Sequence, residues 1–250
     1  MTQRLGRRVR AAVFLRSLAI QGSWNYRTLL GTGFAFALLP ALRALYRDDP
    51  ERLREAVERH SQIFNSHPYL APMALGAVAT LEAGGEDAAV VERFKAAVRG
   101  SLGTLGDRLV WAGWRPVCLL LALALLLAGA AWWVGVVVFL AVYNAGHFLL
   151  RVWSYRLGFR EGKWVGERLR RYPVGKAQRL LAEVGAFLVG LVLPLAVTGG
   201  LVGVEFGPPW IAAAVVAAVL GVGLGSGIRT PIVLCLAVFA VVGLALRMVQ

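Results

Sequence analysis

Four polar side chains stand inside or beside apolar segments of this chain: Asn65, His67, Asp107 and Asn144. A buried polar group without a hydrogen-bond partner costs on the order of 1–3 kcal/mol, so each of the four needs a partner in the folded protein. Asn65 and His67 offer neutral donors and acceptors, which suit weak, reversible contacts with the hydroxyl groups of a sugar; Asp107 and Asn144 are grouped with them because they also need a partner. We therefore treat these four as candidate substrate-binding residues.

Three of the four, Asp107, Asn65 and Asn144, also have a purely structural explanation. Asp107 follows Gly106 at the start of a long apolar run, where a carboxylate can cap a helix by accepting from a backbone N–H two or three residues on. Asn65 precedes Ser66-His67-Pro68, a pattern typical of a turn. Asn144 stands well inside an apolar segment, where it must bond to another helix or to substrate. The residue types leave both explanations open.

The sequence contains none of the common catalytic signatures. It has no Gly-x-x-x-x-Gly-Lys-Ser/Thr loop, no Gly-x-Ser-x-Gly turn and no His-Glu-x-x-His pair. His147 lies on an apolar segment and is interpreted as a packed side chain, and Cys118 and Cys235 as small core residues. A membrane enzyme acting on lipid would need an acid/base pair, for which the sequence offers only Asp107 with His67. We expect no catalytic residue, no cofactor and no metal ion.

The composition is that of an integral membrane protein. Hydrophobic residues make up 58% of the chain and charged residues 16%, with a mean hydropathy of +0.65. Ordinary soluble domains lie nearer 45–50% and 25%. The formal net charge is +13, but the basic residues stand between long apolar segments, so a bilayer explains them better than a nucleic acid does. We expect the lipid bilayer, and no nucleic acid, as a partner.

The longest apolar run predicts a pair of spanning helices. Val117–Leu150 contains no charged residue and would extend about 51 Å as one helix, against a hydrocarbon core of about 30 Å. A break near Ala128–Ala130 divides it into helices of roughly Asp107–Ala128 and Ala131–Tyr155, the first with a kink at Arg115-Pro116. Three further spans are predicted at Leu180–Val202, Pro209–Leu224 and Pro231–Leu246.

The segment before Asp107 is less apolar and predicts a different organisation. Thr28–Leu45 and Pro68–Leu81 are interpreted as re-entrant or interfacial elements, and Pro50–Phe64 as a polar surface helix. The pairs Glu51–Arg54 and Glu55–Arg59 have helical spacing and should lie on the wet side of that helix.

The distribution of Lys and Arg predicts the orientation. Met1–Arg27, Arg93–Arg115 and Arg151–Arg179 are rich in Lys and Arg, whereas Leu201–Trp210 has none. The basic segments, with the N-terminus, therefore belong in the cytoplasm. The expected fold is an all-α integral membrane protein with about four to five spanning helices. It forms one membrane domain, with an amphipathic and re-entrant part at 1–106 and transmembrane helices at 107–250.

Four segments carry motifs that stand in one register. They are Phe14–Asn25 (FLRSLAIQGSWN), Phe64–Gly76 (FNSHPYLAPMALG), Phe94–Asp107 (FKAAVRGSLGTLGD) with Trp111 and Arg115-Pro116 after it, and Asn144 with the run Arg151–Gly162. In these segments, across about Ala12–Gly162, the chain resembles the IID subunit of the mannose/fructose/sorbose family of the phosphotransferase system (PTS).

This resemblance implies a non-catalytic membrane subunit that pairs with a IIC subunit in a hetero-oligomer. The two would form the translocation path for a hexose-type sugar in the bacterial inner membrane, as multi-pass proteins. A cytoplasmic IIB protein, separate or joined to IIA as IIAB, would phosphorylate the sugar with phosphate relayed from phosphoenolpyruvate.

Three positions depart from the pattern of that family. Arg108 follows Asp107 where the family has Pro, Trp114 precedes Arg115 where the family has Thr or Ser, and Ser66 replaces a Thr. These changes fall on the segments expected to handle the sugar. They favour, as the alternative, a regulatory or sensory membrane protein derived from the same family that no longer transports sugar.

Overall fold

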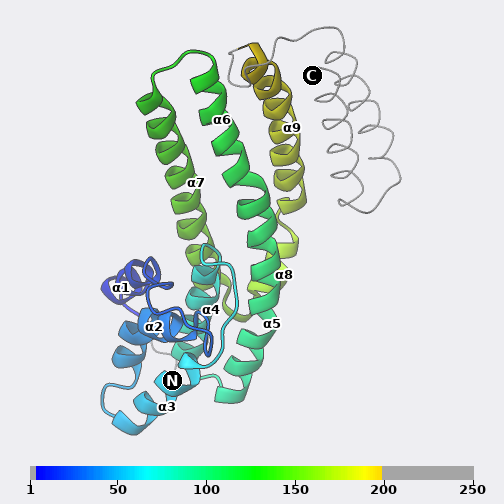
Figure 1. The fold of residues 1–250 in the computed structure, drawn as a ribbon. Helices are drawn as coiled ribbons and strands as arrows, with labels where there is room; N and C mark the ends of the chain where they lie inside the picture. Colours follow the sequence, from blue (N-terminus) through cyan, green and yellow to red (C-terminus); the bar gives the residue numbers. More distant parts are fainter. Residues whose placement is uncertain (1–3, 199–250) are drawn as a thin grey trace. The chain divides into compact units, whose positions relative to one another are not determined.

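The computed structural model describes residues 4–198, and the chain divides after Val192 into two units, of which the first is described below. Regular structure in this range is helical apart from two isolated bridges, Asn25–Leu29 and Leu29–Phe64, so the predicted all-α fold is confirmed there. In chain order the helices are α1 (Arg7–Ser17), α2 (Gly31–Leu45), α3 (Pro50–Ser61), α4 (Ala71–Gly84), α5 (Ala88–Gly106), the π-helix η1 (Asp107–Trp114), α6 (Arg115–Leu127), α7 (Trp132–Glu161), the 3-10 helix η2 (Gly162–Trp164), α8 (Val165–Arg170) and α9 (Val174–Thr198) (Figure 1).

The predicted spans at the C-terminal end are described only in part. Leu180–Val202 is described as far as Thr198, within α9. Pro209–Leu224 and Pro231–Leu246 lie outside the described residues.

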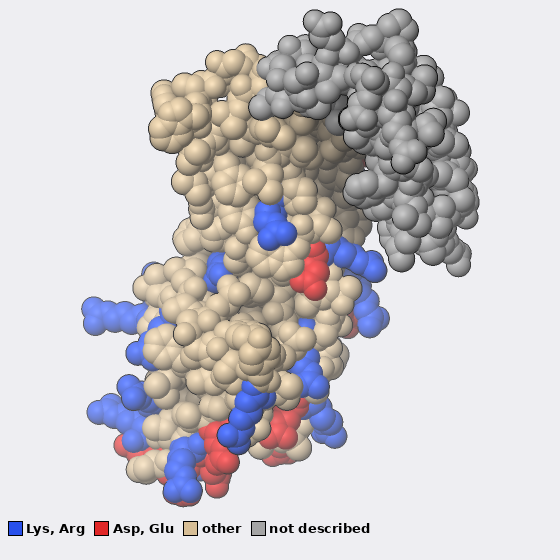
Figure 2. Space-filling model, in the orientation of Figure 1, with Lys and Arg blue, Asp and Glu red and all other residues tan. Residues whose placement is uncertain are grey.

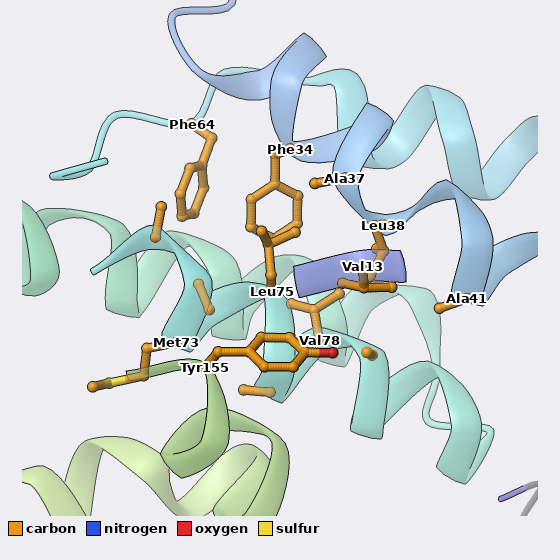
Figure 3. Close-up of a cluster of buried hydrophobic side chains, with 14 of the residues drawn as sticks. Val13, Phe34, Ala37, Leu38, Ala41, Phe64, Met73, Leu75, Val78 and Tyr155 are labelled. Carbon is orange, nitrogen blue, oxygen red and sulfur yellow. The ribbon is translucent and has the colours of Figure 1, made fainter. Parts of the chain in front are cut away.

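Helix α4 forms the centre of the N-terminal unit, which we define as α1–α4 with their loops. Pro72 lies in its first turn, and Gly85 ends it in the left-handed conformation (φ 71°) with its N–H bonded to the Glu82 and Leu81 carbonyls. Nearly all its residues are buried, and Phe34 from α2 and Val13 from α1 pack around them (Figure 3). The interpretation of Pro68–Leu81 and Thr28–Leu45 as re-entrant or interfacial stays a prediction.

Two glycines allow α4 and α7 to touch backbone to backbone. A Cβ atom added to Gly158 would overlap the carbonyl oxygen of Met73, and one added to Gly76 would lie 2.5 Å from the Tyr155 oxygen and 2.6 Å from the Phe159 nitrogen. Thr80 Oγ1 also donates to the Phe159 carbonyl at 2.9 Å. The crossing ties the second half of α7 to the N-terminal unit.

Two long helical segments leave this unit as a hairpin. Ala88–Leu127 comprises α5, η1 and α6 without interruption, and Trp132–Arg170 comprises α7, η2 and α8; both are long and apolar enough to cross a membrane. Gly129, at φ 92°, forms the turn between them, which confirms the predicted break at Ala128–Ala130. On the face shown in Figure 2, charged residues gather around the N-terminal unit and the described part of the hairpin away from it carries none.

The prediction that Asp107 starts a helix is wrong. Asp107 lies within the continuous helical segment from Ala88 to Leu127, and its exposed carboxylate makes no capping hydrogen bond. Gly106 does not end a helix either: it lies within the same segment, and the absence of a side chain there leaves room for the His67 ring. The disturbance predicted at Arg115-Pro116 appears as the π-helix η1. Since proline lacks an N–H and its ring clashes with the carbonyl four residues back, the preceding turn widens.

Helix α3 confirms the predicted helix after Pro50 and, for Glu51, Arg54 and Glu55, its exposed face, but the prediction is wrong for Arg59. Asp49 caps α3 by accepting from the Arg52 N–H at 3.0 Å. Arg59, expected on the exposed side, turns inward and donates to Glu82 Oε1 on α4 at 2.8 Å. The attraction of a buried carboxylate outweighs that of the exposed partner Glu55, so the spacing of the two charges did not decide the contact.

Glu82 ties α2, α3 and α4 together. His60 Nε2 lies 2.8 Å from Glu82 Oε1, and Tyr46 donates its hydroxyl to Oε2. Burial alone would raise the pKa of Glu82, but the hydrogen bonds from His60, Tyr46 and Arg59 outweigh it and lower the pKa to about 2. Burial lowers the pKa of His60 to about 4, so His60 is a neutral donor to an ionised Glu82 near neutral pH.

Candidate functional site

Aromatic and polar side chains gather where the N-terminal unit meets the hairpin. We define this aromatic cluster as His67 and Tyr69 from the loop before α4, Trp111 from η1, and Tyr143 and His147 from α7. The ring centroids of His67 and Trp111 are 4.8 Å apart, and Tyr69 stacks on His147 at 4.7 Å with an interplanar angle of 21°. Segments far apart in the sequence therefore contribute to one group of rings.

His67 is the most buried member of the cluster. Its side chain is 2% exposed, and its Nδ1 accepts a hydrogen bond from the Tyr69 N–H at 3.2 Å. Burial, together with the charge of Arg151, lowers the pKa of His67 to about 4, so the ring is neutral and its proton is on Nε2. Nε2 has no hydrogen-bond partner among the described residues. The site thus contains a buried donor that a hydroxyl group can satisfy.

The remaining polar groups of the cluster form two separate hydrogen-bonded pairs. The hydroxyls of Tyr69 and Tyr143 are 2.9 Å apart, and His147 Nε2 lies 2.9 Å from Asn144 Oδ1. Asn144 also donates to the Leu140 carbonyl at 2.6 Å. Asn144 is exposed. It is connected to the cluster through His147, and its other hydrogen bond is to the backbone of α7.

Arg151 supplies a positive charge beside the cluster. Its side chain is buried, with the guanidinium carbon 4.7 Å from the centre of the Tyr69 ring. It donates to the Ser17 carbonyl at 3.1 Å and so connects the cluster to the end of α1. The buried cation is held by one carbonyl and an aromatic face, and its Nε has no partner among the described residues.

The structure brings two of the four predicted site residues to this cluster. His67 is a member and Asn144 bonds to His147, whereas Asn65 and Asp107 are exposed and make no side-chain hydrogen bond among the described residues. Sequence reasoning did not assign a site role to the other members. One signal was present: Tyr143, His147 and Arg151 follow one another at intervals of four, the spacing that places side chains along one face of a helix.

An apolar hollow of about 340 Å³ lies on the other side of His147. Trp114 lines it, and the Trp114 indole fills the space that a side chain on Gly146 would occupy. The same indole donates weakly to the Tyr143 carbonyl at 3.4 Å. The further lining residues are Leu109, Val110, Leu149, Leu150, Trp153 and Leu181, so His147 is the one titratable side chain of the hollow.

The sequence matches known proteins over most of its length. Residues 4–207 match the family model described as PTS system mannose/fructose/sorbose family IID component. The mannose-specific EIID component of Escherichia coli K12 is 32% identical over 186 residues, and the match covers 72% of this chain and 65% of that protein. The fructose permease IID component of Bacillus subtilis is 26% identical over 196 residues, with 76% and 70% covered. The chain therefore spans just under two thirds of the length of the E. coli relative.

Solved structures show the same fold. A chain in the cryo-electron microscopy structure of the mannose transporter ManYZ with microcin E492 superimposes with a TM-score of 0.61 at 28% sequence identity, covering 75% of this chain and 70% of that chain. A second chain, described as a membrane protein, superimposes with a TM-score of 0.67 at 27% identity over the same shares.

Proposed function

This chain belongs to the mannose/fructose/sorbose family of PTS IID components, and we propose that it forms, with a IIC subunit, the translocation path for a hexose-type sugar. As a member of that family it is a membrane protein of a sugar transport system. The observation that carries the proposal is the aromatic cluster, which lies where the N-terminal unit meets the two helices long enough to cross a membrane.

The cluster has the chemistry of a transient sugar site. Aromatic faces pack against the apolar C–H face of a sugar ring, and neutral donors and acceptors match its hydroxyls. His67 Nε2–H is a buried donor without a partner, and the linked Tyr69 and Tyr143 hydroxyls can each exchange one bond for a sugar hydroxyl. Such neutral contacts are weak enough to release the substrate. We assign substrate contact to His67 and Asn144, and place Asn65 and Asp107 on the surface that faces the partner.

The partner follows from the apolar surface of the hairpin. Leu119 and Leu140 are exposed by 51% and 49%, and the apolar hollow beside His147 has room for side chains from another helix. One structural relative is a chain from the complex of the mannose transporter ManYZ with microcin E492. In this proposal a IIC subunit covers part of the hairpin in a hetero-oligomer. Cytoplasmic IIAB or IIB proteins phosphorylate the sugar, and this chain supplies no catalytic residue.

The proposed setting is the bacterial inner membrane, crossed several times. The division into an N-terminal part at 1–106 and a transmembrane part at 107–250 is part of the same proposal. Trp132 and Trp133 stand exposed at one end of α7 and Arg156 and Arg160 at the other, an arrangement that suits an aromatic anchor outside and basic residues in the cytoplasm. A cysteine at Arg171 should react with an impermeant thiol reagent only from the cytoplasmic side; labelling from outside would reverse the orientation.

The test is sugar uptake measured together with membrane abundance. The chain is produced with a IIC partner in a host without its own mannose-type system, and hexose uptake is compared for Asn65→Ala, His67→Ala, Asp107→Ala and Asn144→Ala. Uptake lost at normal abundance supports the assignment. Uptake that falls only in proportion to abundance would leave the four residues as scaffold.

The alternative function is a regulatory or sensory role without transport. The observation that favours it is that Arg108 and Trp114, two of the three departures from the family pattern, both lie on η1 beside the cluster. Wild-type protein that assembles with IIC at normal abundance but supports no hexose uptake would favour this role over the proposed one.

A further inference from the structure

A hollow of about 680 Å³ between α1 and α7 has a strongly basic rim. Arg7 and Arg10 from α1 and Arg156 and Arg160 from α7 line it, and no carboxylate does. Arg160 Nε donates to Glu161 Oε1 at 2.7 Å, and Arg168 forms an ion pair with the same oxygen at 3.7 Å, whereas Arg7, Arg10 and Arg156 form no ion pair among the described residues. Because like charges repel, the three arginines without an ion pair favour an anion bound in this hollow.

The floor of the same hollow is apolar. Phe14, Val152, Tyr155 and Phe159 line it, and the guanidinium carbon of Arg10 lies 4.9 Å from the centre of the Phe159 ring. A second hollow of about 600 Å³ shares Val152, Arg156 and Arg160 with the first and continues along α7 to Leu149, which is 67% exposed. A ligand that fits this surface has an anionic head and apolar chains.

The position along α7 places the basic rim at the membrane surface. Trp132 and Arg151 are separated by about 28 Å at 1.5 Å per residue, which matches a hydrocarbon core of about 30 Å. The headgroup region adds roughly 5–8 Å on each side. Arg156 lies about 8 Å beyond Arg151 and Arg160 about 13 Å, within reach of the phosphates because long basic side chains bend back toward the interface.

We propose that this hollow binds the phosphate headgroup of an anionic phospholipid, with the acyl chains lying along the Leu149 side of α7. Arginine binds phosphate through two parallel N–H···O bonds, and basic pockets beside spanning helices attract anionic lipids. The bound lipid would contact both α1 and α7 and so hold the two helices together. It is separate from the sugar path and independent of the transport proposal.

The test measures lipid retained by the full chain. The protein is purified in mild detergent, exposed to mixed micelles of phosphatidylcholine and phosphatidylglycerol, washed, and analysed for bound lipid by mass spectrometry. Wild type should retain phosphatidylglycerol over phosphatidylcholine. The triple variant Arg10→Gln, Arg156→Gln, Arg160→Gln should lose that enrichment by roughly tenfold or more, since each arginine near the surface strengthens binding severalfold.

A matched control removes the same charge elsewhere. Arg43→Gln, Arg47→Gln and Arg54→Gln change three exposed arginines that lie outside the hollow and form no ion pair in the described structure, and this variant should retain the lipid. Equal loss in both triple variants would mean non-specific attraction and overturn the proposal. If the first variant fails to fold, the single exposed change Arg156→Gln should still lower the enrichment severalfold, and an unchanged enrichment would contradict the site.

Two further experiments distinguish a lipid from free phosphate, and a lipid from a protein partner, as the occupant of the hollow. Soluble short-chain phosphatidylglycerol should displace the bound lipid, and inorganic phosphate at equal concentration should not; equal displacement by both would mean a free-phosphate site. If the rim variant keeps its lipid but alone fails to co-purify with IIC, the hollow is a protein interface and the lipid proposal is wrong.

Discussion

The N-terminal unit and the hairpin use similar apolar side chains in opposite ways. Helix α4 is buried on nearly all sides, with Leu75 and Met73 inaccessible to solvent, while α7 exposes Leu140 by 49% and Leu149 by 67%. The N-terminal unit therefore lies around a closed core, to which α7 adds Tyr155 and Leu157, whereas the hairpin also has a surface that water would solvate poorly and that lipid or a partner can cover. The difference explains why the polar cluster lies at the boundary, the one place where both environments meet.

The largest expected effect comes from the buried charge of the N-terminal unit. Glu82→Ala leaves Arg59 and Tyr46 without their shared acceptor, which should cost on the order of 3–5 kcal/mol of unfolding free energy. Glu92→Ala, an exposed carboxylate on α5, is the control and should change stability by less than about 0.5 kcal/mol. Thermal unfolding in detergent measures both. Similar effects of the two changes would contradict a structural role for the buried Glu82.

A pair of identical substitutions compares the two regions directly. Leu75→Ala should destabilise the protein by about 2–5 kcal/mol because it opens a cavity in a closed core. Leu149→Ala removes the same atoms from an exposed face and should cost less than about 0.5 kcal/mol. Unfolding in detergent is again the measurement, and equal losses would mean that the α7 face is packed inside this chain.

The backbone contact between α4 and α7 gives a smaller effect. Gly158→Ala forces a methyl group against the Met73 carbonyl and should cost about 1–3 kcal/mol. Gly100→Ala in α5 meets open space, so it should stabilise its helix by about 0.5–1 kcal/mol. Opposite signs are the expected result of a thermal-shift comparison; a stable Gly158→Ala protein would show that the two regions are not held at this crossing.

Stability should also depend on pH. The pKa values of His60 and His67 are lowered to about 4, so the unfolded chain binds protons more readily than the folded one below pH 6.5. Stability should therefore be full above pH 6.5 and fall as the pH drops toward 4. Glu82, with its pKa lowered to about 2, adds a loss below pH 4.5. His60→Gln should reduce the slope between pH 6.5 and 4, and an unchanged slope would exclude His60 as its source.

Local signals in the sequence predicted much of this fold. The uncharged run around Gly129 was too long for one crossing and required a turn, and the Asp49-Pro50 pair marks the start of α3. These features depend on residues close together in the chain. The prediction at Asp107 was wrong because the sequence Gly-Asp before an apolar run is the same whether a helix starts there or continues through it.

Apart from the spacing of Tyr143, His147 and Arg151 on α7, no local signal in the sequence predicted the aromatic cluster. His67 and Trp111 meet because of the way the loop before α4 lies against η1, and that register depends on contacts such as Gly106 against the His67 ring. Arg59 likewise found a partner on another helix rather than on its own. Tertiary contacts of this kind are set by packing, which no short spacing in the sequence reveals.

The most direct test of the account compares its two buried histidines. His60 belongs to the core of the N-terminal unit, bonded to Glu82, while His67 belongs to the aromatic cluster and has an unpaired Nε2 in the described structure. Sugar uptake and membrane abundance are measured with a IIC partner for His60→Gln and His67→Gln. The account predicts that His67→Gln loses most uptake at near-normal abundance and that His60→Gln loses uptake only in proportion to abundance. Uptake proportional to abundance in both variants would contradict it.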